Sequence, residues 1–132
     1  MILVDANILM YAAGAPHPHK QACAGFLERV ATGEAEAVVD AEILREILHR
    51  YRALDRWEDG RRVYDLARTL FPVVLPVTAE VLDRARLLLD AYPHLMARDA
   101  LHAGVMLEHE LEGLCSYDRD FDPVLGVRRF EP

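Results

Sequence analysis

The chain has 132 residues, of which 52% are apolar and 28% charged, and its formal net charge is −7. This length and composition fit one soluble globular domain whose core needs neither disulfides nor structural metals. No apolar run approaches the ~20 residues of a membrane span, and no basic segment precedes an apolar one at the N-terminus, so we expect a cytoplasmic protein without membrane contact.

The first seven residues combine a short strand, an acid and the start of a helix. Ile2–Val4 is an apolar run too short for a helix and typical of a strand that is buried on both faces. Asp5 follows at once, and the residues from Ala6 to Tyr11 have the pattern of a first helix. An acid at such a junction lies at the edge where open α/β sheets bind ligands, although it could also simply cap the helix.

Helical and strand patterns alternate along the rest of the chain. In chain order we expect a helix at 20–32, a strand at 35–39, helices at 41–54 and 57–70, a strand at 73–77, helices at 79–92 and 99–109, and strands at 113–116 and 126–129. Pro76 favours an edge position for the third strand. The alternation predicts a single three-layer α/β domain over residues 1–132, with a mostly parallel central β-sheet flanked by helices.

Four acids fall at equivalent places in this layout. Asp5 ends the first strand, Glu46 lies in the helix after the second strand, Asp99 opens the last helix, and Asp118 follows the fourth strand. If the strands are parallel, all four acids point to one edge of the sheet.

Each of these acids also has an ordinary explanation. Glu46 could pair with Arg50 one helical turn later, Asp99 could be a helix N-cap, and Asp118 could form a turn. Taken one at a time, these explanations account for each acid as well as the functional explanation does, or better. They explain poorly why all four acids converge on the same edge.

A cluster of carboxylates indicates metal chemistry. Crowded carboxylates repel one another, and a divalent cation removes that cost. Oxygen ligands suit Mg²⁺ or Mn²⁺ better than zinc, and Mg²⁺ keeps several waters and completes its shell with substrate phosphate. The expected chemistry is metal-dependent hydrolysis of a phosphodiester.

The six histidines show no clear ligand spacing. His17 and His19 form a short pattern that could bind a transition metal, with exposed loop side chains as the commoner explanation. His102 and His109 lie on the predicted last helix, and we expect them to be partly buried or at the surface.

The acids lie within four motifs: Val4-Asp5-Ala6-Asn7-Ile8-Leu9, Ile43-Leu44-Arg45-Glu46-Ile47-Leu48, Arg98-Asp99-Ala100-Leu101-His102-Ala103 and Ser116-Tyr117-Asp118-Arg119-Asp120-Phe121. In this order and spacing the motifs resemble those of the PIN-domain family, and more narrowly those of the VapC-type toxins of bacterial and archaeal toxin–antitoxin pairs. The resemblance spans essentially the whole chain. Each motif is modest, and together they are specific.

This resemblance implies a Mg²⁺-dependent ribonuclease that cleaves RNA by metal-activated water, with Mn²⁺ as a substitute metal. The implied catalytic residues and metal ligands are Asp5, Glu46, Asp99 and Asp118. The implied supporting residues are Asn7 and Ser116, which would orient ligands or water, and Asp120, a fifth acid at a position where the family varies. The resemblance also implies a cognate antitoxin that covers the active site, and commonly a toxin homodimer.

Basic residues are concentrated near the second acid. Seven of the fifteen basic residues lie between positions 45 and 68, which partly offsets the acidic net charge that argues against a nucleic-acid partner. We expect Arg45, Arg50 and Arg52 to contact RNA phosphates, with a solvated or antitoxin-facing surface as the alternative.

Three other functions are compatible with this fold class. A solitary RNA-processing nuclease, or a non-catalytic module that binds RNA or protein, remains open as an alternative to a toxin. A phosphorylatable receiver domain is excluded, because it needs a lysine at the end of a late strand and Lys20 is the only lysine.

Overall fold

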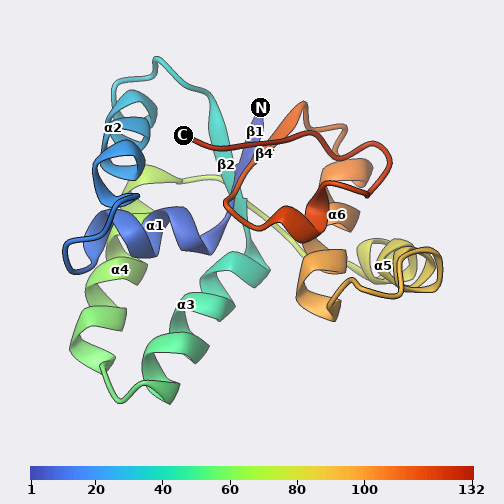
Figure 1. The fold of residues 1–132 in the computed structure, drawn as a ribbon, viewed down its shortest axis with the longest axis horizontal. Helices are drawn as coiled ribbons and strands as arrows, with labels where there is room; N and C mark the ends of the chain where they lie inside the picture. Colours follow the sequence, from blue (N-terminus) through green and yellow to red (C-terminus); the bar gives the residue numbers. More distant parts are fainter.

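A parallel sheet of five short strands forms the centre of the protein in the computed structural model, which describes residues 1–132 (Figure 1). The strand order is β3-β2-β1-β4-β5, and all four neighbouring pairs are parallel. The strands are β1 (Ile2–Val4), β2 (Ala37–Asp40), β3 (Val74–Leu75), β4 (Gly113–Cys115) and β5 (Arg129–Phe130). The expected α/β fold with a parallel sheet is therefore confirmed, and the third strand occupies the predicted edge.

Six helices connect the strands and cover the sheet. They are α1 (Ala6–Ala13), α2 (Lys20–Ala31), α3 (Ala41–Ala53), α4 (Trp57–Leu70), α5 (Ala79–Ala91) and α6 (Ala97–Glu108). Figure 1 shows α1 to α4 on one side of the strands, and α5 and α6 on the other. This division follows from right-handed crossovers, because the chain moves from β1 out to β3 in one direction and then returns past β1 to β4.

The first strand is the buried centre of the sheet. Leu3 lies opposite Val38 of β2 and Leu114 of β4, and none of these three side chains is more than 1% exposed. A strand covered by helices on both faces must be apolar throughout, as Ile2–Val4 is. From β1 the chain continues to β2 and β3 on one side of the sheet, and it later returns to β4 on the other side of β1. The strand order therefore reverses at β1, and α/β sheets bind their ligands at such a switch point.

Several expected boundaries differ from the observed ones by one to three residues, and two of these errors have a clear local cause. Helix α6 begins at Ala97 with Met96 in the N-cap position, so Asp99 lies inside the first turn and does not cap the helix. The last strand is Arg129–Phe130, not 126–129, because Gly126 adopts a φ of 87° and the Val127 amide bonds the Val124 carbonyl in a turn. No helix in the structure is both long and apolar enough to cross a membrane.

Candidate active site

The four predicted acids line one hollow of about 520 Å³ at the carboxyl ends of the strands. Asp5 comes from the end of β1, Glu46 from α3, Asp99 from α6, and Asp118 from the segment after β4. The hollow is also lined by Asn7, Met10, Tyr11, Arg45, His49, Arg50 and Arg98. The structure thus brings together residues that span 113 positions of the chain, from 5 to 118.

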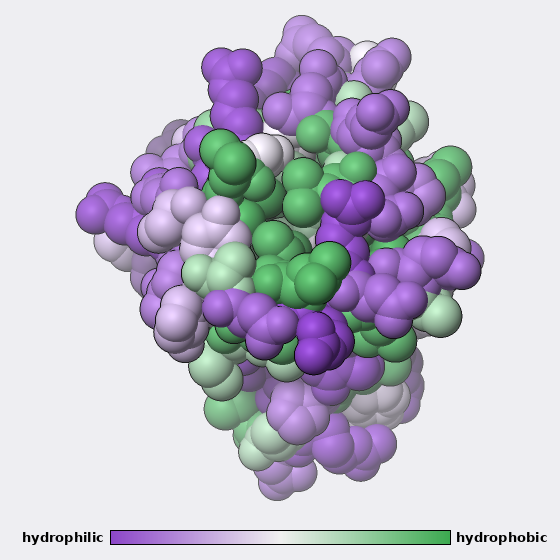
Figure 2. Space-filling view, turned by 90° about the vertical axis from the view of Figure 1, so that its right-hand side faces the viewer, coloured by the Kyte–Doolittle hydropathy of each residue, from purple (hydrophilic) through white to green (hydrophobic).

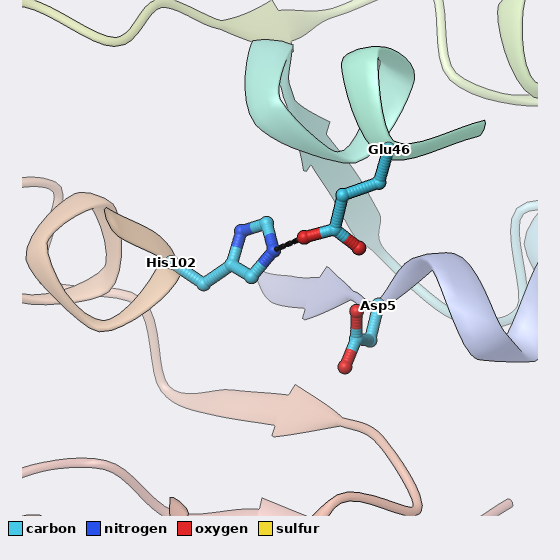
Figure 3. A group of neighbouring side chains, drawn as sticks. All are labelled: Asp5, Glu46 and His102. Atoms are coloured by element: carbon cyan, nitrogen blue, oxygen red, sulfur yellow. Dashed lines mark hydrogen bonds and ion pairs between the residues drawn. The ribbon is translucent and has the colours of Figure 1, made fainter. Parts of the chain in front are cut away.

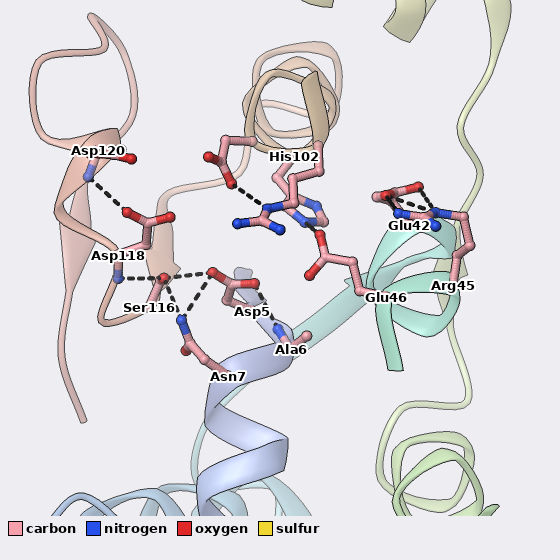
Figure 4. A network of polar contacts seen from close by, with 12 residues as sticks. Asp5, Ala6, Asn7, Glu42, Arg45, Glu46, His102, Ser116, Asp118 and Asp120 are labelled. Carbon is pink, nitrogen blue, oxygen red and sulfur yellow. Dashed lines mark hydrogen bonds and ion pairs between the residues drawn. The ribbon is translucent and has the colours of Figure 1, made fainter. Parts of the chain in front are cut away.

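Asp5 is held in place by hydrogen bonds to both of its carboxylate oxygens. Its Oδ1 accepts from the Ala6 amide at 2.7 Å, so Asp5 does cap α1 as the ordinary explanation supposed. Its Oδ2 accepts from the Ser116 hydroxyl at 2.6 Å and from Asn7 Nδ2 at 3.4 Å (Figure 4). Capping and site formation are therefore compatible roles of one side chain.

Ser116 joins the ends of β1 and β4. Its fully buried hydroxyl donates to Asp5 and accepts from Asn7 Nδ2 at 3.3 Å and from the Asp118 amide at 3.0 Å. One hydroxyl therefore fixes the Asp5 carboxylate and the backbone of Asp118 at the same time. Asn7 keeps its Oδ1 buried and without a hydrogen-bond partner.

His102 is the residue whose role the sequence did not reveal. The imidazole is 1% exposed, so the expectation of a partly buried or surface residue was wrong. Its Nε2 lies 2.9 Å from Oε1 of Glu46 (Figure 3), and its Nδ1 lies 2.7 Å from Oδ2 of Asp40. The pair between Glu46 and Arg50, which was the ordinary explanation of this acid, is absent, because Glu46 turns toward this imidazole instead.

The two contacts on the imidazole require a proton on each ring nitrogen, which is the imidazolium form. Burial alone would lower the pKa of His102, but the charge and hydrogen bond of Asp40, and the hydrogen bond of Glu46, raise that pKa well above its usual value. Asp40 is itself fully buried and caps α3 by accepting from the Ile43 amide at 2.8 Å. Glu46 is thus held in a fixed position through His102 and Asp40.

Asp99 is a buried acid with a free oxygen. The residue is 4% exposed, and its Oδ2 has no hydrogen-bond partner. Burial, followed by the nearby Asp118 charge, raises the pKa of Asp99 to about 6. The exposed Asp120 lies beside them, and its amide donates to Asp118 Oδ1 at 2.9 Å.

These residues fit a divalent cation. Ligand atoms of Asp5, Glu46 and His102 lie within 4.8 Å of one another, and so do those of Asp99, Asp118 and Asp120. Since both nitrogens of His102 are already occupied by carboxylates, the free donor atoms are all oxygens, which hard cations prefer. Asp99 Oδ2 and Asn7 Oδ1 are buried without a hydrogen-bond partner, which costs free energy. A cation and its waters would remove that cost.

The three arginines named from the sequence have different surroundings. Arg45 forms an ion pair with Glu42 at 2.6 Å, and the Arg52 guanidinium lies 4.7 Å from the centre of the Trp57 ring. Arg50 forms no ion pair or hydrogen bond with another side chain, and it lines the acidic hollow. It is the arginine whose charge is free to meet a ligand.

Comparison with known proteins agrees with this geometry. The family profile described as PIN domain matches residues 2–124. The chain is 44% identical over 129 residues to VapC ribonuclease Mb1869c of Mycobacterium bovis and to ribonuclease VapC13 of Mycobacterium tuberculosis, covering 98% of this chain and 98% of each relative. The crystal structure of VapBC2 from Rickettsia felis, bound to a DNA fragment from its promoter, superposes with a TM-score of 0.78 at 16% identity, covering 100% of this chain and 99% of the other.

Proposed function

Because the chain belongs to the PIN-domain family, and within it to the VapC-type ribonucleases, we propose that Asp5, Glu46, Asp99 and Asp118 hold Mg²⁺ and that the protein hydrolyses single-stranded RNA with it. Mn²⁺ is expected to substitute. The protein is the endoribonuclease toxin of a toxin–antitoxin module. We expect it to act in the cytoplasm, because its proposed substrate is cellular RNA. The convergence of four acids from four separate elements on one hollow carries the proposal.

A divalent cation bound by these acids would generate a nucleophilic water near neutral pH and stabilise negative charge on the phosphate and the leaving oxygen. The chain's own residues supply the positions. Ser116 and Asn7 orient Asp5, while His102 orients Glu46. Asp99 lines the hollow and keeps its buried Oδ2 without a hydrogen-bond partner. Because these groups are fixed before substrate binds, little reorganisation accompanies the reaction.

Arg50 is the residue that we expect to contact substrate phosphate. An acidic hollow repels RNA, and an unpaired cation at its wall offsets part of that repulsion. Arg45 and Arg52 lie on the same helix and are expected to contribute less, since Glu42 and Trp57 already hold their guanidinium groups.

A cognate antitoxin is the protein partner of such a toxin, and we expect it to cover the acidic hollow. We also propose a homodimer through the face that carries α5. Figure 2 shows apolar surface gathered on this side of the molecule, and three leucines of α5, Leu82, Leu87 and Leu89, are between 37% and 63% exposed. Apolar patches of this kind mark protein interfaces more often than free surface.

Metal dependence tests the proposed activity directly. Purified protein should cleave a single-stranded RNA in Mg²⁺ or Mn²⁺ and stop when EDTA is added, with cleavage restored by excess metal. Asp99→Asn protein, purified in the same way, is the control for contaminating nucleases and should be inactive in either metal. Cleavage that continues undiminished in EDTA would rule out the metal mechanism.

A further inference from the structure

A second hollow adjoins the acidic one. It is lined by Met10, Tyr11, Gly14, Ala15, Pro16, His17, Arg50, Tyr51, Leu54 and Arg56. Met10, Tyr11 and Arg50 line both hollows, so the two form one continuous surface. The acidic hollow contains the candidate metal ligands, whereas the second hollow contains aromatic rings and arginines. With a cation held by the acids and Arg50 between the two hollows, a ligand that bridges them would carry both negative charge and a flat apolar group.

Tyr11 is the centre of a cluster of four rings, two of which, Tyr11 and His17, line the second hollow. Its ring centre lies 4.4 Å from that of His17, 5.2 Å from that of His19 and 5.6 Å from that of Tyr117. His19 stacks on Tyr117 at 3.8 Å with an angle of 13° between the planes. The contacts fix the orientation of Tyr11 from two sides, because His17 and His19 come from the loop before α2 and Tyr117 from the segment after β4.

The cluster remains open to solvent. His17 is exposed, and Tyr11, His19 and Tyr117 are each only partly buried. Tyr117 lies between Ser116 and Asp118 in the sequence, so the ring cluster is next to the acidic site. Rings that served only the core would be covered, as Phe71 and Phe121 are. A preoriented, accessible ring surface is the arrangement with which proteins stack unpaired nucleobases.

Arg50 supplies the matching charge at the boundary. It is free of ion pairs and lies on the wall shared by the two hollows. Arg56, on the wall of the second hollow, is less available, because it bonds Asp59 and lies 5.7 Å from the centre of the Tyr51 ring. With the scissile phosphate over the acids, Arg50 is placed to meet the next phosphate along the strand.

We propose that the hollow around Tyr11 is a nucleobase subsite, in which Tyr11 and His17 stack the base of the nucleotide that lies one phosphate beyond the scissile phosphate, while Arg50 contacts the phosphate between that nucleotide and the one at the cut. The inference rests on the proposed ribonuclease function, since it names where that substrate lies. A base enters the hollow only when it is unpaired, so the subsite selects single-stranded RNA over duplex.

The test measures binding and base stacking separately from cleavage. A short single-stranded RNA carries the fluorescent base 2-aminopurine, placed in turn at each position around the cut site. Anisotropy gives the dissociation constant, and quenching of the 2-aminopurine reports stacking. All proteins carry Asp99→Asn so that the RNA stays intact. The variants are Tyr11→Leu, Tyr11→Phe, His17→Ala and, as a control that lines neither hollow, Tyr64→Leu.

At one position the intact ring should quench the probe, and Tyr11→Leu should abolish the quenching and weaken binding by at least about fivefold, the lower end of the stacking range. Tyr11→Phe should keep both signals, His17→Ala should weaken them partly, and Tyr64→Leu should change neither. His17 is exposed, so His17→Ala should fold normally. This variant can therefore still test the subsite if Tyr11→Leu is unstable. Binding and quenching that do not respond to Tyr11→Leu or His17→Ala would overturn the subsite.

Three further outcomes separate this inference from its premise. If protein without Asp99→Asn cleaves RNA in Mg²⁺ but Tyr11→Leu and His17→Ala bind RNA normally, the subsite is wrong and the ribonuclease function stands. If Tyr11→Leu weakens binding of the copurified antitoxin and leaves RNA affinity unchanged, the hollow is a protein-binding surface and the inference is also wrong. If protein without Asp99→Asn does not cleave in metal, the proposed function fails, while loss of quenching in Tyr11→Leu would still support a base-binding hollow.

Discussion

Nδ1 of His102 lies 2.7 Å from Oδ2 of Asp40, and neither side chain is more than 1% exposed. The two residues are 62 positions apart, so the bond ties α6 to the start of α3. Since the other ring nitrogen contacts Glu46, a side chain that touches no substrate fixes the position of one that lines the acidic hollow. His102 is therefore a positioning residue.

Replacing His102 by leucine should lower the free energy of unfolding by about 3–5 kcal/mol, because Asp40 would become a buried carboxylate without a partner. Denaturant unfolding measures this change. The matched control is His49→Leu on the exposed face of α3, which should stay within about 0.5 kcal/mol of the parent. Equal stability of the two variants would show that the bond to Asp40 is unimportant.

The same imidazolium predicts a pH dependence. A histidine whose pKa is raised in the folded state stabilises the protein fully below its unfolded pKa of about 6.5, and that stability is lost as the pH rises through the folded value. The difference in unfolding free energy between the parent and His102→Leu should therefore shrink as the pH rises through the raised pKa of His102 into the alkaline range. A difference that keeps growing in the alkaline range would contradict the charged form.

Asp99→Asn should abolish cleavage and make the metal-free protein more stable at neutral pH. The pKa of Asp99 is raised from 3.8 to about 6, mainly by burial and then by Asp118, so ionised Asp99 destabilises the fold above pH 6. The gain should be on the order of 1–3 kcal/mol at pH 7 and should vanish as the pH falls below about 4. Thermal unfolding in EDTA measures it, with the exposed Asp83→Asn as a control.

Saturating Mg²⁺ should reverse this order, because the parent gains binding energy that the variant lacks. A variant that unfolds at neutral pH without metal would instead mean that Asp99 is a structural residue.

Ser116→Ala should weaken metal binding although serine is not a proposed ligand. The substitution removes the 2.6 Å bond to Asp5 and leaves the Asp118 amide without its acceptor. Loss of an orienting partner commonly costs about 10–100-fold in metal affinity or activity. Calorimetric titration with Mn²⁺ measures the affinity without any catalysis, and Thr32→Ala, at an exposed helix end, is the control. An unchanged Mn²⁺ affinity would remove Ser116 from the site.

Arg50→Ala should flatten the salt dependence of RNA binding by about one unit of slope, since one phosphate contact is lost. Arg45→Ala should have a smaller effect, because Glu42 already neutralises that guanidinium. Arg86→Ala on α5, across the sheet from α3, should have none. Binding in the Asp99→Asn background across a salt series gives the slopes. Equal slopes for the parent and Arg50→Ala would leave Arg50 as a solvated side chain.

Replacing Leu82 and Leu89 with aspartate should dissociate the proposed homodimer, because each charge would be buried in an apolar contact. Sedimentation analysis measures the mass. Leu54→Asp, at the end of α3 on the other side of the sheet, is the control and is similarly exposed. A parent protein that sediments as a monomer would remove the dimer from the proposal.

The acids of the site could be predicted from the sequence because their positions depend on local patterns. A short apolar run that ends in an acid, as at Asp5, fixes both the strand and the edge. His102 could not be predicted in this way, because its burial depends on Asp40, which no local pattern connects to it. Its spacing three residues after Asp99 did place it on the same helical face and was the available signal. The early start of α6 was also missed, since Met96 is not a typical capping residue.

The placement of β4 beside β1 has a consequence for synthesis on the ribosome. Asp5 and Ser116 are 111 positions apart, yet they share a hydrogen bond, and Asp99 and Asp118 also come late in the chain. A nascent chain that has formed β1, β2 and α3 holds only Asp5 and Glu46, and the strand that brings the other half must still insert next to β1. Because domains fold as the chain emerges from its N-terminal end, the acidic site is completed only after Asp118 has emerged from the ribosome and β4 has inserted beside β1. Until then the nascent protein lacks its full set of acids.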